Sequence, residues 1–194
     1  DIAFGLAQRG VNSLRLDKRT LGIEPGTSVG LEEEYFADCK VAIEFLKEQD
    51  ITNIYLLGHS LGGQIAPKLA VEDPQIAGMI LFNSTPRHLA DVACDQCKVQ
   101  DTLNEELYMK YAEAAKAVQE ETVQGATYFG MDDYYWSTYN SLDVVADIND
   151  ADIRTLIINS TNDAQIFEVD RNEWYANFGE KDNVTILVYD DMSH

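Results

Sequence analysis

The chain has 194 residues, of which 45% are hydrophobic and 25% charged, so it is long enough for about one domain with a substantial core. Its formal net charge of −20 repels phosphate backbones and anionic membrane surfaces, which argues against nucleic acid as a partner. No run of 18 or more apolar residues is present, and the sequence therefore predicts no membrane-spanning helix. Composition leaves the cellular location and the oligomeric state open.

Helices and strands alternate through most of the sequence. Apolar residues at helical spacing predict helices over four segments: 1–8, 31–49, 61–72 and 168–177. Short apolar runs predict strands over five segments: 11–16, 53–57, 78–83, 154–159 and 184–189. This alternation predicts a doubly wound, mostly parallel sheet, and the near-continuous apolar strands predict a sheet that is covered on both faces.

The stretch Gly58-His59-Ser60-Leu61-Gly62 fits the G-x-S-x-G nucleophile elbow. It lies between an expected apolar strand and an expected amphipathic helix, which is the context that the motif requires. The serine must stand on a strained turn so that its hydroxyl projects from the edge of the sheet. Because strand and helix cross closely there, we expect side chains to collide at Gly58 and Gly62. The alternative is a glycine-rich turn that happens to contain a serine.

The alternation stops between residues 85 and 150, which predicts a helical cap inserted into the fold. The sequence is accordingly divided into a first core part (1–84), the cap (85–150) and a second core part (151–194). The cap contains a cluster of aromatic residues: Tyr128, Phe129, Tyr134, Tyr135, Trp136 and Tyr139. Because ligand pockets are usually lined by apolar and aromatic side chains, the candidate pocket residues are His59, Tyr134, Tyr135 and Trp136. Alternatively, the aromatic side chains only pack the cap onto the sheet.

The three cysteines give only weak evidence for a metal or redox site. Cys94 and Cys97 form a lone C-x-x-C, and Cys39 lies in a helical pattern. A zinc site needs two further ligands at suitable spacing, and a redox motif needs a thioredoxin-like context; the sequence has neither. We therefore expect no metal site, and either a disulfide or two free thiols in a surface segment.

The base of a serine hydrolase must come from only three histidines. His59 lies inside the elbow, and His88 begins the insertion. His194 follows the last predicted strand at its carboxyl end, which is the edge of a parallel sheet where Ser60 also lies. His194 is therefore the predicted base.

The acid that orients the base is predicted to be Asp163, in the loop after the strand at 154–159. The order Ser60, Asp163, His194 is the order of nucleophile, acid and base in α/β-hydrolases. Asp190 and Asp191 are the alternatives, because they are nearer to His194 in the sequence. Asp163 could also serve only as a turn former after an asparagine.

Four stretches together resemble bacterial α/β-hydrolases of the esterase and serine-aminopeptidase-like branch. They are DIAFGLAQRGVNSLRLDKRT, IYLLGHSLGGQIAPKLA, TLIINSTNDAQIF and VYDDMSH. The resemblance implies an eight-stranded, mostly parallel sheet, a catalytic triad of Ser60, Asp163 and His194, and no cofactor. It also implies structural roles for Asp17 and Arg19.

The sequence departs from this family at both ends. Family members carry further strands before the first helix, and a His-Gly loop that supplies one oxyanion N–H. They also continue into a last helix after the catalytic histidine. We therefore expect a chain truncated at both ends, with a gap in the sheet between the strands at 11–16 and 53–57. The Leu61 N–H is the one oxyanion donor that can be named here.

Three classes of function follow from these observations. The first is hydrolysis of a small-molecule carboxylic ester through an acyl-enzyme. The second is a serine aminopeptidase-like activity, in which acidic cap residues hold the amine of the substrate: Glu105, Glu106, Glu113, Glu120 and Glu121. The third is a catalytically incomplete hydrolase fold. Acyl group, leaving group and the role of Cys94 and Cys97 are not determined by the sequence.

Overall fold

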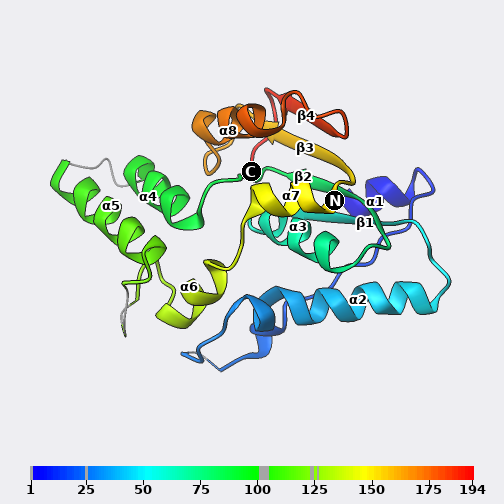
Figure 1. Cartoon of the computed structure of the whole chain (residues 1–194), viewed down its shortest axis with the longest axis horizontal. Helices are drawn as coiled ribbons and strands as arrows, with labels where there is room; N and C mark the ends of the chain where they lie inside the picture. The colour runs from blue at the N-terminus through cyan, green and yellow to red at the C-terminus, as the bar shows by residue number, and fades with distance from the viewer. Residues whose placement is uncertain (1, 25, 101–104, 123–124, 126) are drawn as a thin grey trace.

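The structure, a computed structural model, describes residues 2–24, 26–100, 105–122, 125 and 127–194 (Figure 1). In this part of the chain, four strands form one parallel sheet in the order β1-β2-β3-β4. Their bounds are Ile54–His59 (β1), Ile76–Phe82 (β2), Arg154–Ser160 (β3) and Val184–Tyr189 (β4). The parallel sheet confirms the prediction from the sequence, although with four strands where the resemblance implies eight. All four carboxyl ends lie at one edge.

The described residues form a series of helical elements, among which are the helices predicted over 1–8, 31–49, 61–72 and 168–177. These elements are α1 (Ile2–Ala7), the 3₁₀ turn η1 (Arg19–Gly22), the π-helical turn η2 (Glu32–Phe36), α2 (Ala37–Glu48), α3 (Gly62–Glu72), α4 (Leu89–Gln100), α5 (Glu105–Gln119), α6 (Asp133–Tyr139), α7 (Val144–Ala151) and α8 (Glu168–Phe178). Asp1 of the helix predicted over 1–8 and Leu103 of the predicted helical cap lie outside the described residues. None of the described helices is long and apolar enough to cross a membrane.

The main core lies between the sheet and the helices α3, α7 and α8. Leu81 and Ile157 point into it from the two central strands, and Trp174 and Phe178 cover them from α8. Ile148 of α7 belongs to the same cluster, so α7 packs with the core helices, chiefly α3. The division of the chain at residues 84 and 150 stays a prediction.

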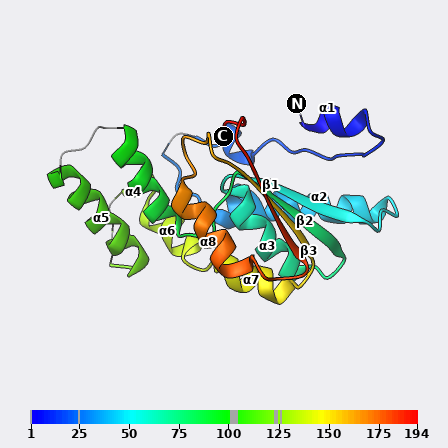
Figure 2. The ribbon, with the colours of Figure 1, turned by 90° about the horizontal axis from the view of Figure 1, so that it is seen from above.

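The opposite face of the sheet is open, contrary to the expectation that both faces are covered. Tyr55, Leu57, Leu187 and Tyr189 are all more than a third exposed, while their neighbours along each strand are shielded. Figure 2 shows the reason, because α3 and α7 lie on one side of the strands, whereas α1 lies on the other side and apart from them. The alternation of exposed and shielded side chains is that of a sheet packed on one face only.

The predicted strand at 11–16 does not form, and this prediction was wrong. These residues lie outside the sheet, and Val11, Leu14 and Leu16 are exposed. A strand is stable only when its N–H and C=O groups pair with a neighbour. None of the described strands lies beyond β1, so residues 11–16 have no partner and the expected gap in the sheet becomes a free edge at β1.

A second apolar cluster joins α3 to the helices between β2 and β3. Ile65 and Leu69 of α3 meet the buried rings of Tyr135, Trp136 and Tyr139. Packing of the insertion is therefore one role of these aromatic residues.

The cysteines of the C-x-x-C lie on α4, which stands beside α5 at one end of the molecule (Figure 1). Cys94 is buried and Cys97 is partly buried, and neither forms a disulfide within the described residues. The expectation of a surface segment was wrong for Cys94, because α4 is amphipathic and Cys94 lies on its inner face.

Candidate active site

Ser60 occupies a strained turn between the end of β1 and the start of α3. Its φ is +54°, in the left-handed region that non-glycine residues rarely adopt. The turn is held by a hydrogen bond of 3.0 Å from the Ser60 N–H to the Phe82 carbonyl and one of 2.9 Å from the Gly63 N–H to the Ser60 carbonyl. This is the strand–turn–helix geometry that the nucleophile elbow requires.

The glycines around Ser60 face different surroundings. A Cβ at Gly58 would lie 2.1 Å from the Gly62 carbonyl oxygen, so no side chain fits there. A Cβ at Gly62 would meet nothing within 4 Å, and the expectation of a collision at this position was wrong. The crowding occurs instead at Gly63, where a Cβ would lie 2.4 Å from Ser84 Oγ. It is thus the backbone of Gly62 that approaches Gly58.

Leu61 is the N-cap residue of α3, with φ −56° and ψ −32°. N–H groups at the start of a helix have no acceptor within the helix, and the positive end of the helix dipole lies there. The Leu61 N–H therefore has the chemistry that an oxyanion needs next to Ser60.

Asp163 and His194 are in direct contact, as their positions after β3 and β4 predict. His194 Nδ1 lies 2.9 Å from Asp163 Oδ2 and 3.1 Å from Oδ1. The Asp163 side chain is fully shielded from solvent, and its Oδ1 also accepts hydrogen bonds from the N–H groups of Gln165 (2.7 Å) and Ile166 (3.1 Å). This arrangement fixes the carboxylate and leaves His194 Nε2 as the nitrogen that can accept a proton.

The last residues of the chain are held by two side chains that sequence reasoning missed. Asn83 Nδ2 donates to the Ser193 carbonyl at 3.0 Å, and Ser160 Oγ donates to the Met192 carbonyl. Asn83 directly follows β2 and Ser160 ends β3, so both stand at the carboxyl edge of the sheet. That placement was the available signal, because polar residues at this edge face the site.

His59 lies against the candidate base. The centroids of the His59 and His194 rings are 4.7 Å apart, and Phe82 flanks His59 at 5.8 Å. Burial holds the pKa of His59 below its usual value, and the proximity of His194 is the second cause of this shift.

Between the described side chains, no hydrogen bond joins Ser60 to His194. Such contacts are often long before a substrate is bound.

The other candidate pocket residues are distributed over two cavities. Tyr134 and Trp136 line a cavity of about 340 Å³ between α5 and α6, together with Glu121 and Asp133. Tyr135 lines a smaller cavity of about 130 Å³ beside the loop before η2. Neither set of lining residues includes Ser60, Asp163 or His194, so the structure does not bring these aromatic residues together with the three.

The alternative acids are placed differently from Asp163. The Asp190 carboxylate accepts a hydrogen bond of 3.1 Å from Thr161 Oγ1 at the surface, and Asp191 is exposed as well.

Across the described ranges, no group of three or more His, Cys, Asp or Glu side chains could hold a metal ion.

The fold and the site define the chain as an α/β-hydrolase. A parallel sheet carries a nucleophile elbow after one strand, and an acid and a histidine in contact after two others. A sequence model of the family described as "Serine aminopeptidase, S33" matches residues 1–194, and the chain belongs to that family.

Comparisons with individual proteins are consistent with membership of this family. A curated protein named esterase EstD, from Thermotoga maritima, is 31% identical over 201 residues, which cover 100% of this chain and 48% of that protein. The chain thus spans about half the length of this relative. An esterase from Pyrococcus furiosus matches with a TM-score of 0.54 and 19% identity, over 87% of this chain and 56% of that one. An α/β-fold hydrolase from Bacillus anthracis matches with a TM-score of 0.51 and 16% identity, over 84% and 68%.

Proposed function

We propose that this chain is a serine hydrolase that cleaves carboxylic esters of small molecules, with Ser60 as nucleophile, His194 as base and Asp163 as acid. The observation that carries the proposal is the contact of His194 Nδ1 with Asp163 at 2.9 Å, at the sheet edge where Ser60 stands in a strained turn. A nucleophile, a base and an orienting acid on one edge are the parts that acyl transfer requires.

The proposed reaction proceeds through an acyl-enzyme. His194 Nε2 takes the proton of the Ser60 hydroxyl while Ser60 Oγ attacks the ester carbonyl carbon. The tetrahedral intermediate collapses when His194 returns that proton to the leaving alcohol. Water then attacks the acyl carbon while His194 takes a proton from it, and the bond from the acyl carbon to Ser60 Oγ breaks as His194 gives that proton to Ser60 Oγ, which releases the acid product. Asp163 holds the imidazole in the required tautomer and stabilises its charged form.

The Leu61 N–H is the proposed donor to the oxyanion of the tetrahedral intermediate. It follows the nucleophile at the N-terminus of α3, where the helix dipole also favours negative charge. Loss of one such donor typically costs ~2.7–4 kcal/mol of transition-state stabilisation. This donor is a backbone group, so its position depends on Gly58 and Gly63, which let strand and helix approach each other.

The substrate is proposed to enter beneath the insertion of residues 85–150, which acts as a cap. Esters are favoured over peptides because the relative at 31% identity is named an esterase. The name of the matching family supports the second candidate, release of N-terminal residues from peptides. Initial rates with a p-nitrophenyl ester and with an aminoacyl-anilide distinguish the two: the proposal expects turnover of the ester, and preferential turnover of the anilide would contradict it.

The first test is covalent labelling with a fluorophosphonate, read by intact mass. We expect one adduct on the chain, no adduct on Ser60→Ala, and an adduct on the control Ser84→Ala. Ser84 is a suitable control because its hydroxyl is buried close to the elbow and contacts no acid–base pair. A folded chain without an adduct would contradict the proposal and support a catalytically incomplete hydrolase fold.

A further inference from the structure

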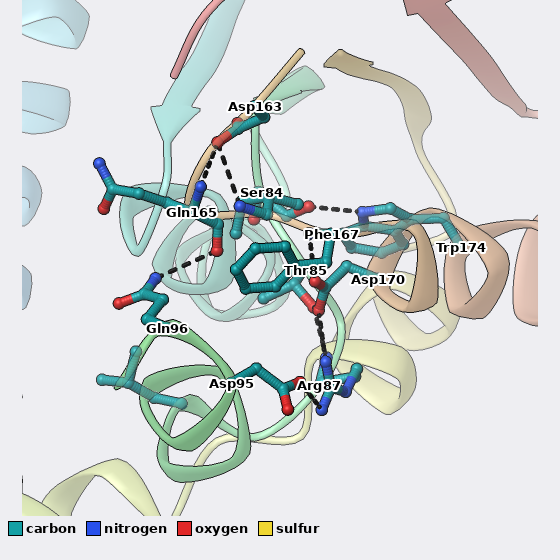
Figure 3. A network of polar contacts seen from close by, with 12 residues as sticks. Ser84, Thr85, Arg87, Asp95, Gln96, Asp163, Gln165, Phe167, Asp170 and Trp174 are labelled. Atoms are coloured by element: carbon teal, nitrogen blue, oxygen red, sulfur yellow. Dashed lines mark hydrogen bonds and ion pairs between the residues drawn. The ribbon is translucent and has the colours of Figure 1, made fainter. Parts of the chain in front are cut away.

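A partly buried ion pair links the insertion to the segment that carries Asp163 (Figure 3). Arg87, between β2 and α4, places Nη1 3.2 Å from Asp170 Oδ1 and Nη2 2.8 Å from Asp95 Oδ2. Asp170 lies on α8 and its side chain is fully buried, while Asp95 lies on α4. One guanidinium thus bridges a core helix and a helix of the insertion.

Asp170 has donors on both carboxylate oxygens. Thr85 Oγ1 donates to Oδ1 at 2.5 Å, in addition to Arg87, and the Phe167 N–H donates to Oδ2 at 2.7 Å. Phe167 is the N-cap residue of α8 and ends the loop that begins near Asp163. The carboxylate therefore fixes the far end of the Asp163 loop.

The near end of this loop is fixed on Asp163 itself. The Gln165 and Ile166 N–H groups both donate to Asp163 Oδ1, so the carboxylate keeps its orientation only while this backbone keeps its conformation. A second contact from α4 reaches the same backbone, because Gln96 Nε2 donates to the Gln165 carbonyl at 3.1 Å (Figure 3). Gln96 thus contacts residues 163–167 directly, and Arg87 acts on them through Asp170.

An ion pair whose carboxylate is buried, like that of Asp170, is a poor source of stability. Removing two charges from water costs several kcal/mol per ion, and well-packed apolar replacements are often equally stable or more stable. A planar guanidinium that donates through Nη1 to one carboxylate and through Nη2 to another does fix geometry, because its N–H groups point in fixed directions. The pair is therefore better suited to fixing a conformation than to adding stability.

We propose that Arg87 and Asp170 are positioning residues that couple helix α4 to the catalytic acid. The pair holds residues 163–167 in the conformation in which the Asp163 carboxylate meets His194 Nδ1. Displacement of α4 is transmitted through Arg87 and Gln96 to the orientation of His194. The inference rests on the proposed function in one respect, since it takes the contact between Asp163 and His194 to be catalytic.

The direct test is proton NMR of the imidazole N–H signals. A proton shared between an imidazole and a carboxylate resonates far downfield, and the chain has only three histidines to assign. Loss of the signal in His194→Gln and Asp163→Asn identifies it. Absence of this signal from the folded parent chain would contradict the contact between Asp163 and His194, and with it both the proposed function and the coupling.

The coupling is then tested with Arg87→Met, Arg87→Lys and the apolar pair Arg87→Met with Asp170→Leu. The apolar pair avoids a lone buried charge, so it covers the case in which Arg87→Met does not fold. We expect the downfield signal to be lost in Arg87→Met and in the apolar pair and partly restored in Arg87→Lys. For misplacement of the acid we expect kcat for an activated ester to fall by about 10²-fold with little change in KM.

The matched control is Lys68→Met. Lys68 pairs with the largely buried Asp147 at 3.7 Å, on α3 and α7 and away from the Asp163 loop. We expect a loss of stability without loss of the downfield signal. The proposal would be overturned if the signal survived in a folded apolar-pair variant, or if it disappeared equally in Lys68→Met.

Discussion

At the scale of single residues, two adjacent glycines of the elbow differ in whether a side chain would fit at their position. Gly62 begins α3 with open space around its missing side chain, whereas Gly63 faces the fully buried Ser84. The space around each glycine, and not the G-x-S-x-G pattern, decides which of the two tolerates a side chain.

We therefore expect Gly62→Ala to raise the free energy of unfolding by about 0.4–1 kcal/mol, because alanine restricts the unfolded chain and suits a helix. Gly63→Ala should lower it by about 1–3 kcal/mol through overpacking. Urea unfolding followed by circular dichroism measures both. Ser84→Gly should partly rescue Gly63→Ala, and equal effects of the two alanine variants would show that the assigned contact with Ser84 is wrong.

At the scale of elements, His88 joins the start of α4 to the end of α6. Its Nδ1 accepts from the Ala90 N–H at 3.1 Å, its Nε2 lies 2.9 Å from Asn140 Oδ1, and its ring packs edge-on to Tyr139. Burial lowers the pKa of His88, and the hydrogen bond to Asn140 opposes this shift only in part. The folded state therefore favours the neutral ring, with the proton on Nε2.

The stability of the chain should accordingly fall as the pH drops below about 6.5, the ordinary pKa of histidine. In that range the unfolded chain binds the proton before the folded chain does, so the free energy of unfolding decreases with falling pH. Urea midpoints at pH 7.5 and 5.5 should differ more for the parent than for His88→Gln. His59→Gln gives the separate contribution of the other histidine with a lowered pKa. An unchanged difference in His88→Gln would contradict this assignment.

At the scale of the whole molecule, the sheet is covered on one face only. Ile157 is completely buried beneath α3, α7 and α8, whereas Leu187 on the neighbouring strand is 38% exposed on the open face. Replacing an apolar residue with threonine should therefore change the stability by different amounts on the two faces.

We expect Ile157→Thr to destabilise the fold by about 2–4 kcal/mol, because it leaves a cavity and buries a hydroxyl. Leu187→Thr should change the stability by less than about 0.5 kcal/mol, since the site is exposed and threonine suits a strand. Chemical unfolding of both variants measures the difference. A large loss in Leu187→Thr would mean that the open face is covered in solution.

Local patterns predicted most of the elements correctly, and they also selected the three candidate site residues, whose roles stay a prediction. The strand at 53–57, the elbow and the helix after it are encoded within twenty residues, and residue type and chain order alone selected Ser60, Asp163 and His194. Their placement at one edge follows from a parallel sheet. The strand at 11–16 could not be judged locally, because a strand exists only where a neighbour supplies hydrogen bonds.

The sequence by itself determined the class of fold and predicted the elbow and an order of nucleophile, acid and base, because these depend on periodicity and on side-chain chemistry. Only the tertiary structure decided that Gly63 and not Gly62 is crowded, that one face of the sheet is open, and that Asn83 and Ser160 hold the end of the chain. The ion pair of Arg87 with Asp170 likewise joins residues 83 positions apart. Contacts of this kind depend on how helices pack against the sheet, which no local pattern of residues specifies.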